Sequence, residues 1–316
     1  MAKKRTLDDF RDLFSQLTAT NEEYIFQTDR AFSVEKEDNI QETNAELRIE
    51  RIDVLFLCAV NDELDAMKEY LDYNKIALEY SVDIDGFYFD LSTRKRNISC
   101  ILVKQKEAGM VSCACLCGRL LKFEPKLVVM PGICGGINGK VNQGDIVVAS
   151  TVYDYGSGKY FADGTFEPSP NQYQIDPRLI RCINASSQNL GGILTTCASH
   201  VLSIKDRNGN MFHNNEGTIS IRQGTMATGA SVVNNQAIVN AMKSHNRNVI
   251  AYDMEAYALA YVSTNFLDMP IPWLVVKGVQ DFPNTEDKNM YTKLAAYVST
   301  AIAIDVVRSY FSYFYP

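Results

Sequence analysis

Apolar residues in most of this chain form short continuous runs that alternate with stretches of helical spacing. A continuous run such as 52–60 or 271–279 is typical of a strand that is buried on both faces. Strands are predicted at 52–60, 86–93, 98–103, 127–130, 145–149, 218–223, 249–252 and 271–279. Helices are predicted between or after them at 61–71, 110–123, 177–188, 232–243, 255–266 and 289–310.

The order of these elements predicts the fold class. Strands that alternate with helices favour an α/β domain in which a mostly parallel, mixed sheet is covered by helices on both faces, giving three layers. The exception is an antiparallel hairpin made by 86–93 and 98–103. The segment 153–218 contains many turn-forming residues and is expected to be long loops around the short helix at 177–188.

Residues 1–50 have a different pattern, and the domain is therefore expected to span 51–316. Apolar residues at helical spacing predict an amphipathic helix at 7–18, and a polar, acidic arm follows it. A lone amphipathic helix rarely persists without something to pack on. Two interpretations stay open, a poorly ordered tail or a contact with a second subunit or a regulatory partner.

Composition narrows the function classes. With 46% hydrophobic and 22% charged residues the chain is typical of a globular protein, and its formal charge of −7 speaks against general nucleic-acid binding. We expect neither a membrane span nor a signal peptide. The eight cysteines lie mostly in apolar runs, which favours buried thiols and a cytoplasmic location. Cys113, Cys115 and Cys117 are expected to be core residues rather than zinc ligands. No metal or cofactor is expected.

Carboxylates follow two of the predicted strands. Because ligands of open α/β sheets bind at the carboxyl ends of strands, both positions are candidates for chemistry. Glu255 can accept hydrogen bonds from the vicinal hydroxyls of a ribose, or it is simply an acid at a helix start. Asp281 can act as a general acid in a poorly solvated cleft, or it pairs with Lys277 or Lys288.

Two further segments follow strands. Glu63 lies just after the first strand and, from periodicity alone, is best explained as an acid of the first helical turn. The segment 131–139, with sequence PGICGGING, is predicted to be a tight glycine-rich turn. It matches neither the phosphate-binding P-loop nor the dinucleotide-binding pattern.

Taken in order, these segments resemble the nucleoside phosphorylase/nucleosidase superfamily, and within it the methylthioadenosine/S-adenosylhomocysteine nucleosidase-like branch. The resemblance covers about 52–312, and its strongest parts are PGICGGINGKVNQGDIVVAS (131–150), DMEAYALA (253–260) and KGVQDF (277–282). It implies a three-layer phosphorylase-like domain with an N-terminal helical arm. The lysine-containing KGVQDF segment is similar to nucleosidase domains of signalling or defence assemblies, in which the substrate can be an adenine nucleotide.

The resemblance also implies roles for individual residues. Glu63 would be the base that orients the attacking water, and Asp281 would protonate N7 of the purine. The remaining substrate contacts implied are Met254 and Glu255 on the ribose, Cys134 and Gly135 beside base and sugar, Ala227 and Thr228 at the base, and Lys277 and Lys288 on phosphates. The sequence departs from the family at Ile133, Gln280 and Ala227, where serine, serine and an aromatic residue are common.

The sequence therefore predicts a purine nucleosidase, adenine-selective, that hydrolyses a nucleoside or nucleotide and acts as a homo-oligomer. A phosphate-dependent phosphorylase is the near alternative, but the 107–110 loop has no arginine to hold phosphate. A non-catalytic nucleotide sensor is the second alternative. Retention of both Glu63 and Asp281 speaks against it, because a pure binder needs neither a base nor an acid.

Overall fold

The computed structural model describes residues 52–201, 219–283 and 291–315, and all of them belong to one compact unit. The predicted helix at 7–18, the polar arm and the expected boundary at residue 50 lie outside the described residues, as does Lys288. The division into an arm and a domain stays a prediction.

A mixed β-sheet forms the middle of the domain, with strand order β11-β10-β6-β12-β5-β1-β4-β3-β2 and β9 paired to β6. Its strands are β1 (Val54–Cys58), β2 (Glu79–Ser81), β3 (Gly86–Ser92), β4 (Asn97–Lys104), β5 (Leu127–Gly136), β6 (Ile146–Asp154), β9 (Gln172–Gln174), β10 (Ile221–Thr228), β11 (Val249–Asp253) and β12 (Trp273–Asp281). The central strands β1, β4, β5 and β12 run parallel, and β3–β4 is the predicted antiparallel hairpin.

One additional pairing brings the two ends of the longer half of the sheet together. Strand β11 pairs with β10 on one side and with the end of β5 on the other, through Ala251–Gly136 and Tyr252–Gly135. Strands β11, β10, β6, β12 and β5 therefore close into a ring. This closure brings the ends of β5, β11 and β12 to one place.

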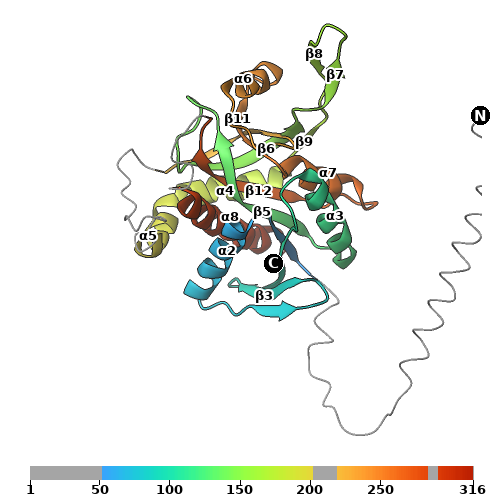
Figure 1. The fold of residues 1–316 in the computed structure, drawn as a ribbon. Coiled ribbons are helices and arrows are strands. Elements are labelled where there is room, and N and C mark those ends of the chain that lie inside the picture. The colour runs from blue at the N-terminus through green and yellow to red at the C-terminus, as the bar shows by residue number, and fades with distance from the viewer. Residues whose placement is uncertain (1–51, 202–218, 284–290, 316) are drawn as a thin grey trace, which may run out of the picture. The chain divides into compact units, whose positions relative to one another are not determined.

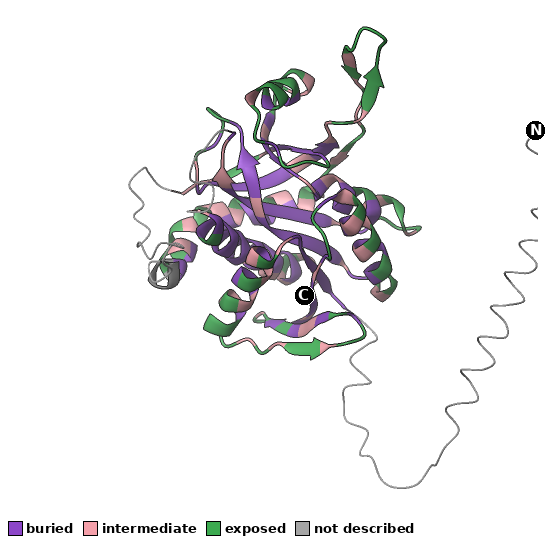
Figure 2. Cartoon of the chain, viewed as in Figure 1, coloured by how far each residue is buried: buried purple, intermediate pink, exposed green. Residues whose placement is uncertain are grey.

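Helices cover the sheet on both faces, as predicted (Figure 1). They are α2 (Asn61–Tyr73), α3 (Met110–Leu120) with the 3₁₀ turn η2 (Leu121–Phe123), α4 (Pro177–Gln188), α5 (Leu190–Val201), α6 (Gln236–His245), α7 (Ala256–Asn265) and α8 (Thr292–Phe314). Helices α2, α4 and α5 pack with α8, which lies on β5 and β12, while α3 and α7 pack together. Burial is concentrated in the strands and in α8 (Figure 2).

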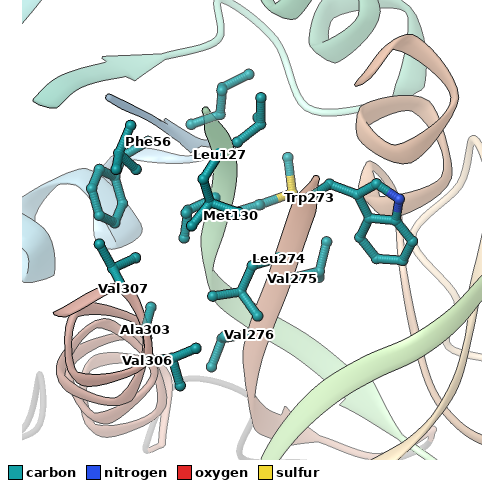
Figure 3. Close-up of a cluster of buried hydrophobic side chains, with 14 of the residues drawn as sticks. Phe56, Leu127, Met130, Trp273, Leu274, Val275, Val276, Ala303, Val306 and Val307 are labelled. Atoms are coloured by element: carbon teal, nitrogen blue, oxygen red, sulfur yellow. The ribbon is translucent and has the colours of Figure 1, made fainter. Parts of the chain in front are cut away.

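Helix α8 is the central helix of the core. Its residues Ala303 and Val306 lie against Leu274 and Val276 of β12 (Figure 3). Length and composition alone would let α8 cross a membrane, but 83% of its most apolar window is buried within the domain. It is therefore explained as a core helix. Near its end, Tyr310 and Phe311 are fully buried, whereas Tyr313 is 69% exposed.

Two segments differ from the prediction. The glycine-rich segment 131–139 was predicted to be a turn, but its first part, up to Gly136, belongs to strand β5. This part of β5 pairs with both β12 and β11. The segment 153–218 also contains more regular structure than expected. Besides the predicted α4 it includes the end of β6, the small hairpin β7 (Gly158–Tyr160) and β8 (Phe166–Pro168), strand β9 and helix α5.

Candidate active site

Glu63 is the most completely enclosed carboxylate of the candidate site. It lies in the first turn of α2, directly after β1, and is 2% exposed. Its Oε2 accepts from the backbone N–H of Ala59 at 2.5 Å and of Val60 at 3.4 Å. Its Oε1 accepts from the N–H of Ile133 at 2.9 Å. The carboxylate therefore points back from the helix start toward β5, rather than into solvent.

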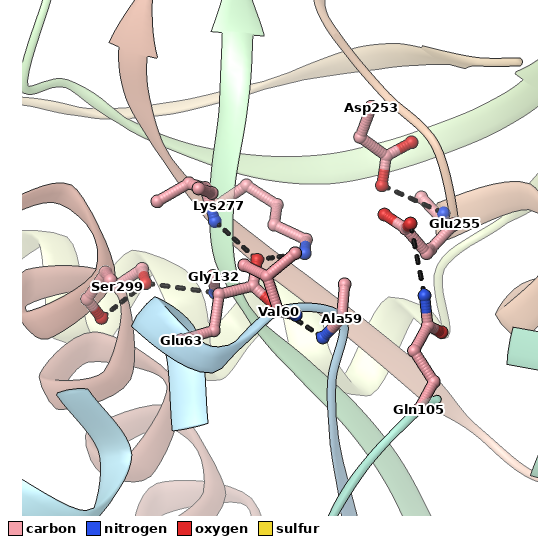
Figure 4. Close-up of polar contacts among 12 residues, drawn as sticks. Ala59, Val60, Glu63, Gln105, Gly132, Asp253, Glu255, Lys277 and Ser299 are labelled. Carbon is pink, nitrogen blue, oxygen red and sulfur yellow. Dashed lines mark hydrogen bonds and ion pairs between the residues drawn. The ribbon is translucent and has the colours of Figure 1, made fainter. Parts of the chain in front are cut away.

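The fourth donor to Glu63 is a buried lysine. Lys277 lies within β12 with no exposed surface, and its Nζ is 2.9 Å from Oε1 of Glu63 (Figure 4). Burial disfavours the ammonium, yet Glu63, Glu255 and Asp253 together raise the pKa of Lys277 above its usual value. Lys277 was predicted as a phosphate contact. In the structure its charge neutralises Glu63, and a contact with phosphate stays a prediction.

Gly132 makes room for this ion pair. It is the β5 neighbour of Lys277 in the sheet, and its N–H donates to Oγ of Ser299 on α8 at 3.1 Å. A Cβ at this position would lie 1.8 Å from Oε1 of Glu63 and 2.7 Å from Nζ of Lys277. The first glycine of the glycine-rich segment is therefore explained by close packing against charged side chains, not by a turn.

Glu255 and Asp253 form a second buried acidic group at the end of β11. Oε1 of Glu255 accepts from the N–H of Gly109 at 2.6 Å and from Nε2 of Gln105 at 3.2 Å. Asp253 accepts from Oγ1 of Thr228 at 2.8 Å and from the N–H of Ala256 at 2.9 Å, which caps the start of α7. The predicted alternative, an acid at the helix start, therefore describes Asp253, while the Glu255 side chain makes no such cap bond.

Burial has a strong electrostatic effect on this pair. Glu255 is 4% exposed, and burial followed by the nearby Asp253 raises its pKa to about 7. Burial also raises the pKa of Asp253, although Lys277 and the bond from Thr228 oppose it. The charge of Asp253 thus disfavours ionisation of Glu255, as expected for closely spaced acids.

Asp281 lies at the end of β12, as the strand-end argument predicted. It pairs in register with Gly135 of β5, beyond an irregularity at Gln280. Gln280 is held on both sides, because its carbonyl accepts from Nε2 of Gln143 at 2.6 Å and its Oε1 accepts from Oγ1 of Thr292 at 2.9 Å. Gln280 therefore connects the end of β12 to the start of α8. These bonds hold the backbone just before Asp281 in place.

Cys134 shows that these groups surround one place. It is buried at the end of β5, and burial raises the pKa of its thiol, which Asp253 and Asp281 raise further and Lys277 lowers. Next to it, a Cβ on Gly135 would lie 2.2 Å from Cζ of Tyr252, so the tyrosine ring covers this glycine. The Glu63, Glu255 and Asp281 positions therefore share one edge of the sheet.

The other predicted contacts are placed less directly. Thr228 is joined to Asp253 and accepts from the N–H of Tyr257 at 3.1 Å, so it belongs to the acidic group at β11. Ala227 has no exposed surface and packs in a small core with Tyr252 and Val233. Met254 is partly buried beside Glu255. Their contacts to a base or ribose stay predictions.

Sequence reasoning missed Gln105 and Tyr252. Gln105 directly follows β4 and is 1% exposed, so the strand-end rule applied to Glu63 and Asp281 would have found it. Tyr252 gave no such signal, because it reads as an ordinary strand residue of 249–252. Its contact with Gly135 depends on the pairing of β11 with β5.

Comparisons with known proteins agree with this architecture. Residues 53–308 match the family model described as the phosphorylase superfamily. The chain is 29% identical over 263 residues to the uncharacterised protein y4jS of Sinorhizobium fredii, covering 81% of this chain and 61% of that one. It is 23% identical over 270 residues to the ATP nucleosidase Cap17 of Escherichia coli, covering 81% of this chain and 51% of Cap17. The chain thus spans about half to three-fifths of the length of these two relatives.

Among solved structures, the fold matches the 5′-methylthioadenosine/S-adenosylhomocysteine nucleosidase of Neisseria meningitidis in complex with methylthio-immucillin-A. The TM-score is 0.59 at 18% identity, and the match covers 81% of this chain and 98% of that chain. Such a likeness shows the shared fold. Together with the family match over most of its length, it establishes that the chain belongs to the phosphorylase superfamily.

Proposed function

We propose that this protein is a purine nucleosidase, selective for adenine, that hydrolyses the N-glycosidic bond of a nucleoside or nucleotide. The observation that carries the proposal is the pair of buried carboxylates Glu63 and Glu255 on one sheet edge, with the end of β12 and Asp281 beside them. An ordinary core would not retain such groups, because buried charges are costly unless they serve a purpose.

Each carboxylate is suited to one part of the reaction. Glu63 orients the attacking water, Glu255 accepts hydrogen bonds from the ribose hydroxyls, and Asp281 gives a proton to N7 as the base leaves. As the bond lengthens, the sugar becomes positively charged. A site rich in buried carboxylates stabilises that charge in the way that preorganised dipoles stabilise other transition states.

The contacts of the lysines favour water over phosphate as the nucleophile. Within the described ranges, Lys277 is the one buried cation, and it already forms an ion pair with Glu63. Lys104, at the end of β4, donates to the carbonyl of Gln105 at 2.7 Å. A phosphorylase needs cations directed at inorganic phosphate, and neither of these lysines supplies one.

The substrate is proposed as an adenosine derivative that differs at the 5′ position. The relative named as an ATP nucleosidase supports an adenine nucleotide, and the structural neighbour bound to a methylthio-adenosine analogue supports a thioether. A role as an effector in antiviral defence belongs to the nucleotide branch of this proposal. A cytoplasmic location and a regulatory partner bound through residues 1–50 are also part of it.

Homo-oligomerisation is proposed on exposed apolar side chains. Val111 on α3, Tyr261 on α7, and Phe266 and Met269 just after α7 are large apolar residues that lie at the surface. Light scattering on the full chain should show more than one copy, and a strictly monomeric protein would contradict this part of the proposal.

Chromatography of purified protein incubated with adenosine, methylthioadenosine, S-adenosylhomocysteine, AMP and ATP tests the function, with and without phosphate. Free adenine without phosphate is the expected product. Asp281→Asn is the matched control, and losing the general acid should lower kcat by roughly 10²–10⁴-fold. Release only with phosphate would make the protein a phosphorylase. Ligand binding with no release, in either condition, would make it a sensor.

A further inference from the structure

Tyr252, Gly135 and Asp281 lie side by side across three strands. Gly135 on β5 is in register with Tyr252 on β11 and with Asp281 on β12. Residues that pair in register project to the same face of a sheet, and neighbouring strands lie about 4.8 Å apart. Because the residue in the middle of this row is a glycine, β5 places no side chain between Tyr252 and Asp281.

The buried ring of Tyr252 leans over this glycine, in the direction of β12. A Cβ on Gly135 would lie 2.2 Å from Cζ and 2.6 Å from the hydroxyl oxygen of Tyr252, so the hydroxyl end of the ring lies over Gly135. Burial raises the pKa of Tyr252, and the charge of Asp281 is the next largest influence that raises it. The phenol therefore keeps its proton near neutral pH and can donate a hydrogen bond beside Asp281.

The hydroxyl of Tyr252 has only a long bond in the structure. It donates to the carbonyl of Val233 at 3.5 Å, whereas O–H···O bonds are usually about 2.7–2.8 Å long. The hydroxyl of Tyr153, which lies in the same small core, donates to the carbonyl of Met242 at 3.1 Å. A hydrogen bond to an ionised group is shorter and stronger than a neutral one. The Tyr252 hydroxyl would therefore gain by exchanging Val233 for a nearby carboxylate.

We infer that Tyr252 is a positioning residue of the proposed reaction, whose hydroxyl turns from Val233 to Asp281 and stabilises the carboxylate that forms when Asp281 protonates the purine. This inference rests on the proposed function. As the bond between C1′ and N9 breaks, its electron pair goes to the base, and the proton of Asp281 goes to N7. Asp281 is left as an anion, while Tyr252 keeps its own proton and donates a hydrogen bond to that anion.

A pair of uncleavable ligands tests the inference without turnover. In 9-deazaadenosine N7 carries a hydrogen, so Asp281 binds it as a carboxylate, whereas in 7-deazaadenosine a C–H group replaces N7 and offers Asp281 no donor. Tyr252→Phe removes only the hydroxyl. It should weaken binding of the 9-deaza ligand roughly tenfold to hundredfold, as expected for a hydrogen bond to a charged group, and binding of the 7-deaza ligand less than about twofold. Calorimetry measures both ligands, each as the nucleoside and as the 5′-triphosphate.

Steady-state kinetics on a cleavable substrate give the second readout. Tyr252→Phe should lower kcat for adenine release roughly tenfold to hundredfold and change KM less than about twofold, because the bond forms only as the proton moves. In the Asp281→Asn background there is no carboxylate to stabilise, so adding Tyr252→Phe should lower kcat less than about threefold.

Tyr153→Phe is the matched control. It removes a buried hydroxyl from the same small core, so it should lower Tm while kcat stays within about twofold of wild type. A loss of kcat in Tyr153→Phe as large as that in Tyr252→Phe would mean that damage to the core explains both, and it would overturn the inference.

The remaining outcomes separate this inference from the proposed function. The inference is overturned if Tyr252→Phe weakens both ligands equally or neither of them. It is also overturned if Tyr252→Phe lowers kcat by the same factor in the Asp281→Asn background as in wild type. A wild-type protein that distinguishes the two ligands through Tyr252 but releases no adenine would defeat the proposed hydrolysis and still support the contact of Tyr252 with the Asp281 carboxylate. A wild-type protein that binds neither ligand would defeat both.

Discussion

The two buried glutamates of the site differ in how their charge is compensated. Glu63 has an ammonium group 2.9 Å from one oxygen and three backbone N–H donors around it. Glu255 receives only neutral donors, from Gly109 and Gln105, and has the acid Asp253 as a neighbour. Similar burial thus gives one carboxylate fixed in place by a counter-ion and another that exchanges its proton close to neutral pH.

The difference matches what each residue has to do in the proposed reaction. A base that orients water must be ionised and immobile while the substrate changes around it, which a buried ion pair provides. A group that grips a ribose must exchange one set of hydrogen-bond partners for another, so neutral donors suit it better. The contrast also makes pH a tool for telling the two groups apart.

The largest effect is expected from Glu63→Gln. The change removes the base and leaves the buried ammonium of Lys277 without the carboxylate that it contacts directly. We expect kcat to fall roughly 10²–10⁴-fold and the free energy of unfolding to fall by about 3–5 kcal/mol. Steady-state kinetics and urea unfolding measure the two losses. A variant that keeps a tenth of the activity would show that the ion pair is structural only.

Glu255→Gln should have the next largest effect, and it should depend on pH. The ionised form is the better acceptor for hydroxyls, so wild-type kcat/KM should rise as the pH increases through about 7. The variant should lose this rise and be roughly 10²-fold less active above it, which corresponds to the loss of hydrogen bonds to a charged group. Exposed Glu107→Gln on the neighbouring loop is the matched control and should behave like wild type.

The same variant makes a stability prediction whose sign is opposite to that of a salt-bridged acid. The pKa of Glu255 is raised from 4.5 in the unfolded reference to about 7 in the folded protein. Its contribution to stability is therefore fully present below pH 4.5 and is lost as the pH rises toward 7. Urea titrations at several pH values should show this loss in wild type and a smaller one in Glu255→Gln.

Gly132→Ala tests how tightly the ion pair of Glu63 and Lys277 is packed. Its added methyl group would overlap both members of the pair, and such overpacking costs about 1–3 kcal/mol of unfolding free energy. Gly191→Ala is the control, because a methyl group there meets nothing within 4 Å. Equal unfolding midpoints in urea for the two variants would mean that the pair can move aside freely.

Gln105→Leu should give the smallest effect. The change removes one donor from Glu255, while the shorter bond from Gly109 remains. We expect roughly a tenfold loss of kcat/KM, the lower end of what a hydrogen bond to a charged group contributes. A loss as large as that of Glu255→Gln would mean that Gln105 contacts the substrate directly.

The local pattern predicted much of the fold. Helix α2 begins at Asn61 and the β3–β4 hairpin lies where the alternation placed them, because an apolar run and a helix start are properties of neighbouring residues. The same reasoning placed Glu63 and Asp281 at strand ends. It failed for the glycine-rich segment, where glycines that look like a turn instead allow β5 to pass close to Glu63 and Tyr252.

The sequence by itself determined which residues have the chemistry and at which strand ends they lie. Only the tertiary structure decided which of them act together. From the sequence Lys277 could pair with Asp281 or bind phosphate, and only the pairing of β12 with β5 shows that it lies 2.9 Å from Glu63. The physical reason is that burial and charge compensation depend on groups that are far apart in the chain. The electrostatic interactions between these groups are strong because the pairing of β5, β11 and β12 encloses them in a low-dielectric space.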